Sequence, residues 1–243
     1  MIKEAIQHYK QSHGYSQFSP RCVLFDMDGV LYNSMPNHAV AWHEAMKQFG
    51  IHFTADDSYA TEGARGVDTI RKYVLEQQGK EISSEEAQRM YDVKTEIFHH
   101  MPIAEIFPGV IDIMQKIKSA GMTIGVVTGS GQRPLIKRLL NDFDGFLTED
   151  HIVTAYDVER GKPNPDPYLM GLRKTGNNNP WQGIVVENAP LGVRAGSAAN
   201  CFTIGINSGP LPDSTLADNG ANIVLQQMTE LCSIWDELLQ NID

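Results

Sequence analysis

The sequence predicts an α/β fold in which a doubly wound parallel sheet, similar to the Rossmann fold, carries an inserted helical cap. From about residue 108 onward, short apolar segments alternate with segments of helical periodicity, which is the pattern of a parallel sheet with crossover helices. Between residues 35 and 107, helical segments follow one another with no strand between them. We therefore expect an α/β core made of residues 1–34 and 108–243 and a four-helix cap domain of residues 35–107.

The core begins with an amphipathic helix that ends at Gly14, and its first strand lies in the apolar segment 23–31. An apolar run of this kind is typical of a strand that is buried on both faces of a parallel sheet. Further strands are expected at 123–127, around 153, at 183–188 and at 202–206, with helices at 109–120, 134–141, 166–174, 190–199 and 229–239.

The cap is predicted to contain helices at 36–49, 55–61, 67–77 and 84–100. Ser83 is the candidate N-cap of the last one, and Glu86 three residues later completes a capping box. The segments 32–35 and 101–107 would connect the cap to the core, and such paired linkers are where a cap can hinge.

Composition and charge narrow the classes of function. The chain has 243 residues and a formal net charge of −10, which argues against binding to nucleic acid or to a membrane surface, because both need clustered Lys and Arg. No apolar run approaches the ~20 residues that span a bilayer, and the amino terminus lacks the apolar core of a secretory signal. We therefore expect a cytoplasmic protein, a monomer or weak homo-oligomer, with its three cysteines as free thiols.

Two carboxylates lie within the first apolar segment, directly after its predicted strand. In an extended backbone the side chains of Asp26 and Asp28 leave on the same side, roughly 7 Å apart, at the edge of the sheet where α/β proteins bind ligands. One can act as a nucleophile and the other as a proton donor. The alternative is a strand followed by an ordinary Asp-Gly turn.

Further polar residues follow the other predicted strands. Thr128, Gly129 and Ser130 come directly before a helix, where a hydroxyl and backbone N–H groups can hold phosphate oxygens. The Lys162 ammonium could neutralise both a carboxylate nucleophile and a phosphoryl group. Simpler interpretations are a common turn, a solvated loop lysine and, for Asn188, a helix N-cap.

The same residues could bind a divalent cation. Oxygens from Asp26, from the backbone carbonyl of Asp28 and from Glu187 or Asn188 suit Mg²⁺, with water and a phosphate oxygen completing an octahedron. Without a cation and a lysine, several carboxylates beside a phosphate dianion would repel one another strongly.

These residues resemble the four motifs of the haloacid-dehalogenase superfamily. The motifs are Asp26-Met27-Asp28-Gly29-Val30-Leu31, Thr128, Lys162 and Glu187-Asn188, and the resemblance covers about residues 22–224. The inserted helices resemble the cap of the β-phosphoglucomutase-like branch. The resemblance implies attack by Asp26 on phosphorus to form an aspartyl-phosphate, with Asp28 as general acid and base and Mg²⁺ as the cofactor.

The chain departs from the family pattern in two places. Asn188 stands where the family commonly has Asp, so one negative charge is missing from the metal site. Gly66 and Glu96 stand, by visual alignment, where the mutases of this branch carry Arg and Lys. The segment 61–66 instead resembles the cap loop of hydrolytic members, which include inorganic pyrophosphatases.

Four cap residues are candidates for contact with substrate. Glu62 would repel a second bare phosphate but could serve a metal-bridged or water-bridged pyrophosphate, and Arg65 is a candidate phosphate clamp. His38 and Trp42, one turn apart on the first cap helix, are expected to face the cleft, and packing inside the cap is the alternative for Trp42.

The leading hypothesis is a Mg²⁺-dependent phosphohydrolase that acts on a small phosphorylated compound, either pyrophosphate or a sugar phosphate. The alternative is a β-phosphoglucomutase that interconverts β-glucose 1-phosphate and glucose 6-phosphate. A phospho-accepting signalling module fits less well, because it needs neither a cap nor an acid two residues after its acceptor.

Overall fold

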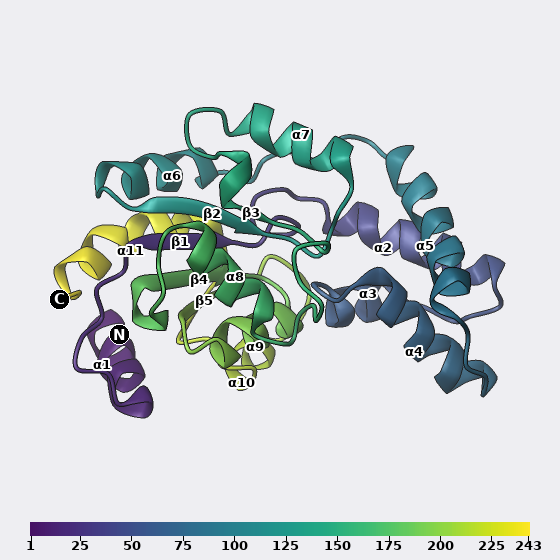
Figure 1. Ribbon diagram of the computed structural model, residues 1–243, viewed down its shortest axis with the longest axis horizontal. Helices are drawn as coiled ribbons and strands as arrows, with labels where there is room; N and C mark the ends of the chain where they lie inside the picture. The colour runs from purple at the N-terminus through teal and green to yellow at the C-terminus, as the bar shows by residue number, and fades with distance from the viewer.

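The computed structural model describes residues 1–243, and its centre is a six-stranded sheet flanked by helices (Figure 1). All strand pairs are parallel and the strand order is β3-β2-β1-β4-β5-β6, which confirms the predicted doubly wound sheet. The strands are β1 (Cys22–Phe25), β2 (Thr123–Val127), β3 (Ile152–Val153), β4 (Gly183–Glu187), β5 (Phe202–Ile206) and β6 (Ile223–Leu225).

Helices cover both faces of the sheet. Alternate residues of β1 point to opposite faces, so Val23 and Phe25 join one apolar cluster while Cys22 and Leu24 join another. The first cluster includes side chains of α1 (Ile2–His13), α6 (Val110–Ser119), α7 (Arg133–Asp142) and α11 (Met228–Gln240), and the second those of α8 (Asp166–Lys174) and α9 (Pro190–Ala198). Burial on both faces explains why β1 is apolar throughout. None of the helices has the length and apolar character needed to cross a membrane.

The predicted segment 23–31 is a strand only in its first part. After Phe25, the Asp26 N–H still donates to the Val186 carbonyl oxygen at 2.9 Å, but the chain then turns. Gly29 has φ of 82°, a conformation that favours glycine. The turn leaves Asp26 and Asp28 at the carboxyl end of the sheet.

Other boundaries differ from the predictions by small shifts and two omissions. The expected helix at 109–120 begins at Val110, because Gly109 adopts φ of 87° and serves as its N-cap. The strand β6 and the short helix α10 (Asp213–Asp218) were not predicted, since three and six residues are too short to show periodicity. The three cysteines are free, as expected.

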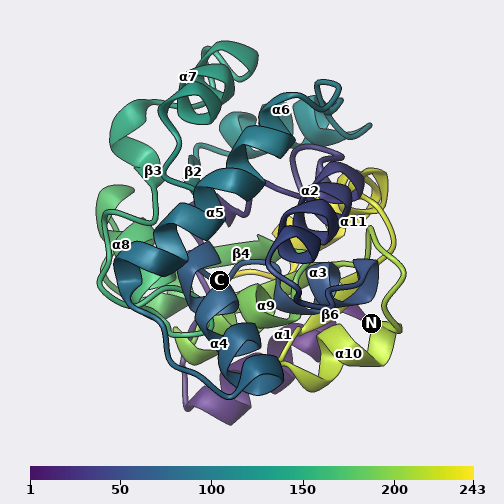
Figure 2. The ribbon, with the colours of Figure 1, turned by 90° about the vertical axis from the view of Figure 1, so that its right-hand side faces the viewer.

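Four consecutive helices form the cap: α2 (Met35–Gln48), α3 (Ala55–Thr61), α4 (Gly66–Gln78) and α5 (Ser84–His99). They lie together at one end of the molecule and face the viewer in Figure 2. Ten buried residues, among them Trp42, Met46 and Phe53, form an apolar cluster of the cap's own. At the start of α5, Ser83 Oγ accepts from the Glu86 N–H at 3.2 Å, which is half of the predicted capping box.

The two linkers between cap and core run side by side. The Asn33 N–H donates to the Glu105 carbonyl oxygen at 2.9 Å, and the Phe107 N–H donates to that of Leu31 at 3.0 Å. Tyr32 and Ile106 form an antiparallel bridge between these two bonds. The division into a core and a cap of residues 35–107 stays a proposal, which the separate apolar cluster and the paired linkers support.

Candidate active site

The candidate residues meet at the carboxyl edge of the sheet. The strand β1 lies between β2 and β4, so Asp26 after β1, Thr128 after β2 and Glu187 at the end of β4 are neighbours. The strand order reverses between β1 and β4, and such a switch point is where open α/β sheets bind ligands.

Lys162 joins these strand ends. It lies in the loop between β3 and α8, and its Nζ donates to Asp26 Oδ1 at 2.5 Å, to Glu187 Oε1 at 2.6 Å and to the Val127 carbonyl oxygen at 3.0 Å. The side chain is 1% exposed. Burial alone would lower the pKa of Lys162, but Asp26 and Glu187 raise it above its usual value, so the lysine is a fixed positive charge.

Glu187 uses both carboxylate oxygens inside the protein. Oε1 accepts from Lys162 and from the Tyr168 hydroxyl at 2.8 Å, and Oε2 accepts from the backbone N–H groups of Asn188 and Ala189. A methyl group on Gly192 would lie 1.7 Å from Oε1, so only glycine leaves room for this carboxylate. Glu187 therefore orients Lys162 and the start of α9.

Two buried oxygens beside this network have no hydrogen-bond partner: Asp26 Oδ2 and Asn188 Oδ1. A buried polar atom without a partner is costly, and a bound ion is one explanation for it. The Mg²⁺ that the family resemblance implies takes oxygen ligands and is commonly held by one or two carboxylates with water and substrate phosphate. These two atoms fit that description.

No group of three or more His, Cys, Asp or Glu side chains is arranged to hold a metal ion. A cation at this edge would therefore need main-chain oxygens, water or substrate to complete its coordination. Of the two predicted ligands Glu187 and Asn188, Asn188 is the better candidate, since its oxygen lacks a hydrogen-bond partner whereas both Glu187 oxygens have partners.

Asp28 is held by the cap and the first linker. Its Oδ1 accepts from Ser34 Oγ at 2.6 Å and lies 3.3 Å from His38 Nε2, and the Lys94 Nζ lies 2.7 Å from His38 Nδ1. Burial would raise the pKa of Asp28, but His38, Ser34 and Lys94 together lower it. Asp26 and Asp28 therefore occupy different electrostatic environments.

Burial raises the pKa of Asp26 to about 7, with Glu187 and Asp28 adding to the rise and Lys162 opposing it. Burial also raises the pKa of Glu62 to about 8. The nearby carboxylates of Asp28 and Asp26 add to this rise, and Lys94 and Lys162 oppose it. The site thus gathers more negative charge than its two lysines balance, which again favours a cation.

Glu62 lines a small cavity between cap and core, at the end of α3. The cavity has a volume of about 40 Å³ and is also lined by Asp28, Lys94, Thr128 and Gly129. Such a volume holds only a few water molecules. The cap is therefore closed over the strand ends, and a substrate can enter only if the cap moves.

In the predicted phosphate loop, one of the expected donors is used by a hydrogen bond within the loop. Thr128 Oγ1 accepts from the Ser130 N–H at 3.0 Å, so this donor is not free as predicted. Gly129 lies under the cap, since a methyl group at this position would be 3.1 Å from the Gly63 carbonyl oxygen. Thr128, Gly129 and Ser130 all border the cavity.

The structure does not bring Arg65 to the cavity, although the sequence suggested a phosphate clamp there. Its Nε donates to Asp68 Oδ2 at 2.8 Å and its Nη1 to the Glu159 carbonyl oxygen at 2.9 Å. The second bond joins the cap to the core on the outside of the cleft.

Sequence reasoning missed Lys94, which is the basic cap residue at the site. Glu96, which was aligned with the mutase lysine, is exposed, whereas Lys94 is 2% exposed and lines the cavity. Lys94 follows Ala87 and Met90 on the buried face of α5, so a lysine on an apolar helix face was the available signal. His38 does face the cleft, and Trp42 both lines the cavity and packs in the cap cluster.

Comparison with known proteins agrees with this geometry. The family model described as haloacid dehalogenase-like hydrolase matches residues 23–206. The chain belongs to this family. The match includes every strand that contributes to the site, and it confirms the resemblance inferred from the motifs.

Individual relatives point to the β-phosphoglucomutase-like branch. Hexitol phosphatase A of Escherichia coli is 30% identical over 214 residues, covering 87% of this chain and 94% of that protein. The β-phosphoglucomutase of Bacillus subtilis is 24% identical, with 87% and 91% covered. A structure from Bacteroides vulgatus, provisionally named a β-phosphoglucomutase, has a TM-score of 0.95 and 45% identity, covering 100% of this chain and 98% of that one.

Proposed function

We propose that this protein is a Mg²⁺-dependent phosphohydrolase that acts through an aspartyl-phosphate on a small phosphorylated compound. The observation that carries the proposal is the arrangement around Asp26. One carboxylate oxygen is held by Lys162, and the other is buried without a hydrogen-bond partner, as is the Oδ1 of Asn188 on the neighbouring strand end. A nucleophile held in this way by a lysine, with unpaired oxygens that a cation could use, suits attack on a phosphoryl group.

In the first step an Asp26 oxygen forms a bond to phosphorus while the bond from phosphorus to the leaving oxygen breaks. Asp28 gives its proton to that oxygen and then takes one from the water that hydrolyses the aspartyl-phosphate. Lys162 stays charged and offsets the carboxylates during both steps. A bound Mg²⁺ would neutralise phosphoryl charge and align the two oxygens, with Asp26 and Asn188 among its ligands and the Asp28 carbonyl a further candidate.

Asp28 needs a proton when the leaving oxygen departs. The His38 imidazole beside it and the Lys94 ammonium beyond are the groups placed to supply one. Because both belong to the cap, closure of the cap completes the acid side of the site.

The second candidate function is that of a β-phosphoglucomutase. Lys94 favours it, since a buried cap lysine could bind the distal phosphate of a bisphosphate, and so does the likeness to proteins with that name. Two cap features favour a hydrolase. Glu62 brings a carboxylate into the cavity, and the Tyr91 ring fills the space beside Gly66, where a side chain would lie 2.1 Å from it.

The substrate candidates differ in their support. Relatives named for hexitol phosphate and for glycerol 1-phosphate favour a sugar or polyol phosphate. Pyrophosphate depends on Glu62 alone, through a cation or water between its carboxylate and the second phosphate. The cytoplasm stays the proposed compartment, on the basis of the free cysteines.

The test is a panel of sugar phosphates, polyol phosphates and pyrophosphate, assayed for phosphate release with and without Mg²⁺. We expect multiple turnover with Mg²⁺ and loss of activity by about a thousandfold or more in Asp26→Asn. Asp236→Asn, which removes an exposed carboxylate, is the matched control and should retain activity. Full turnover in Asp26→Asn would overturn the nucleophile assignment, and conversion of β-glucose 1-phosphate to glucose 6-phosphate without net release would select the mutase.

A further inference from the structure

A larger pocket lies on the linker side of Asp28. Its volume is about 190 Å³, and it is bounded by the two linkers, the end of α5 and the first turns of α7. Half of its lining residues are hydrophobic, among them Met27, Phe98, Ile103 and Leu135. We call it the linker pocket, and Asp28 is the one candidate site residue from the sequence that lines it.

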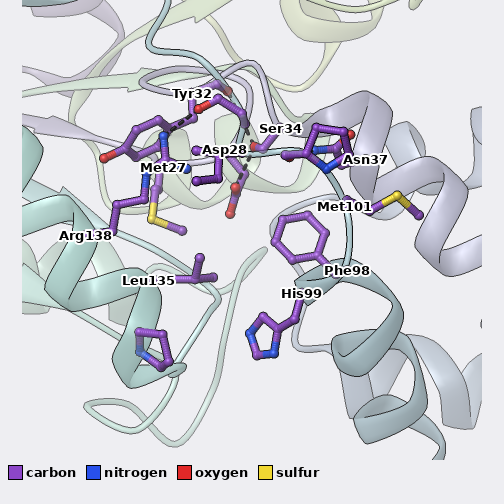
Figure 3. Close-up of a pocket in the computed structure, with 14 residues that line it drawn as sticks. Met27, Asp28, Tyr32, Ser34, Asn37, Phe98, His99, Met101, Leu135 and Arg138 are labelled. Atoms are coloured by element: carbon purple, nitrogen blue, oxygen red, sulfur yellow. Dashed lines mark hydrogen bonds between the residues drawn. The ribbon is translucent and has the colours of Figure 1, made fainter.

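The linker pocket borders the small cavity under the cap. Asp28 and Leu135 line both spaces, so together they form the boundary between them. Figure 3 shows the Asp28 carboxylate pointing into the linker pocket, between Leu135 and Phe98. A molecule that reaches from one space to the other must pass this carboxylate.

The small cavity is too narrow for a complete phosphate ester. The cavity has a volume of about 40 Å³, and it lies beside Thr128 and Gly129, where the phosphoryl group would bind. The atoms attached to the leaving oxygen need further room within reach of Asp28, because a general acid must approach that oxygen to within about 3 Å. The linker pocket supplies such room.

The charges of the linker pocket disfavour a second anion. Asp28 contributes a carboxylate. The Arg138 guanidinium is engaged by the protein, since its Nε donates to Asp142 at 3.0 Å and its Nη2 donates to the Ala104 carbonyl oxygen. It also stacks 4.3 Å above the Tyr32 ring. Lys94 and Lys162 do not line this pocket. A second phosphate here would meet the Asp28 carboxylate, and the basic groups of the lining are only His99 and the already paired Arg138.

We propose that the linker pocket binds the carbon skeleton of the leaving alcohol, and that the natural substrate is the monophosphate ester of a neutral sugar or polyol with an apolar face. This inference rests on the proposed function and narrows its substrate class. Phe98, Leu135 and Ile103 contact the C–H groups of the alcohol, while the phosphoryl group stays beside Thr128. Ile103, which is 79% exposed, covers the skeleton at the mouth of the pocket.

The test compares substrates that differ only in their alcohol. Ethyl phosphate and a six-carbon polyol phosphate are assayed with the wild type, with Leu135→Trp, which narrows the pocket, and with Ile103→Asp, which places a charge at its mouth. Lys137→Trp is the matched control, because it puts the same ring on an exposed position of α7. Ile103→Asp changes an exposed residue, so its folding is not at risk.

In the wild type we expect kcat/KM to be higher for the six-carbon ester than for ethyl phosphate. Both pocket variants should lower kcat/KM for the six-carbon ester by about tenfold or more. Ile103→Asp should change kcat/KM for ethyl phosphate by less than about threefold, whereas Leu135→Trp, which also borders the small cavity, should lower it for ethyl phosphate at least about threefold less than for the six-carbon ester. Lys137→Trp should leave both substrates unaffected.

Equal losses for the two esters, or no loss for the longer one, would overturn the linker pocket as the alcohol site. Preference of the wild type for pyrophosphate over every ester would also overturn it, while leaving the phosphohydrolase intact. If the wild type releases phosphate from no compound in the panel, the proposed function fails, and this inference fails with it.

Discussion

Asn188 Oδ1 and Asp26 Oδ2 are both buried without a hydrogen-bond partner. If both bind Mg²⁺, Asn188→Asp adds a unit charge next to a divalent ion, which is worth on the order of 1–2 kcal/mol even at the dielectric constant of water. We expect Mg²⁺ to bind about tenfold more tightly to the variant in a calorimetric titration, whatever the effect on activity. Asn178→Asp adds the same charge at an exposed position and should leave the affinity unchanged. Equal affinities for Asn188→Asp and the wild type would remove Asn188 from the proposed ligands.

Single residues could be predicted where the strand order alone determines their neighbours. Asp26, Thr128 and Glu187 come together because parallel strands end at one edge of the sheet. Lys94 and Arg65 could not be placed in this way, because their partners depend on the position of the closed cap. Lys94 contacts His38 beside the site, and Arg65 donates to the Glu159 carbonyl oxygen outside it.

The turn after β1 depends on Gly29. It has φ of 82°, and a methyl group there would lie 2.0 Å from Asn188 Nδ2. Gly29→Ala should therefore combine backbone strain with displacement of Asn188, and we expect a loss of about 2–4 kcal/mol in the free energy of unfolding. Denaturant unfolding of Gly29→Ala and Gly14→Ala separates the two effects. Gly14 has φ of 66° but open space around it, so Gly14→Ala should lower the free energy of unfolding by only about 1–2 kcal/mol. Equal losses would mean that Asn188 moves aside freely.

The cap helices were predicted more accurately than the first strand. The four cap helices begin and end within one residue of the expected positions, since each has enough residues to show its periodicity and, for α5, its N-cap. The apolar segment 23–31 was too long for the strand it contains, because apolar residues of the turn, such as Val30 and Leu31, are buried as completely as those of β1. Hydrophobicity records burial, and it does not separate a buried strand from a buried turn.

At the scale of the molecule, the closed cap is the feature that the sequence could not reveal. Cap helices pack around their own apolar cluster, so their internal structure follows from local pattern, whereas their position over the core follows from a few contacts across the cleft. These contacts include Gly63 beside Lys162 and a bond from Gln132 to Thr95 at 3.4 Å. The closed state thus depends on small, partly polar contacts, which suits a cap that must open for substrate.

Arg65 provides one of these contacts, and its removal tests how the closed cap is held. The Nη1 bond to the Glu159 carbonyl oxygen crosses from cap to core, and such a bond contributes about 0.5–1.5 kcal/mol. We expect Arg65→Ala to speed hydrogen exchange of the amides at 62–66 and 128–132 by about two- to tenfold, because the cap opens more often. The global free energy of unfolding should change by less than about 1 kcal/mol, since the guanidinium is partly exposed.

The control for this experiment is Arg71→Ala, which removes an exposed guanidinium from α4 without a cap-to-core bond and should leave exchange unchanged. The same variants show whether Arg65 only holds the cap closed, as a latch, or binds the substrate phosphate, as a clamp. Loss of a latch alters cap opening and changes KM by less than about threefold, whereas loss of a charge-assisted bond to substrate would raise KM by about tenfold or more with normal exchange. That second pattern would place Arg65 in contact with the substrate after all, and it would require a cap position different from the closed one seen here.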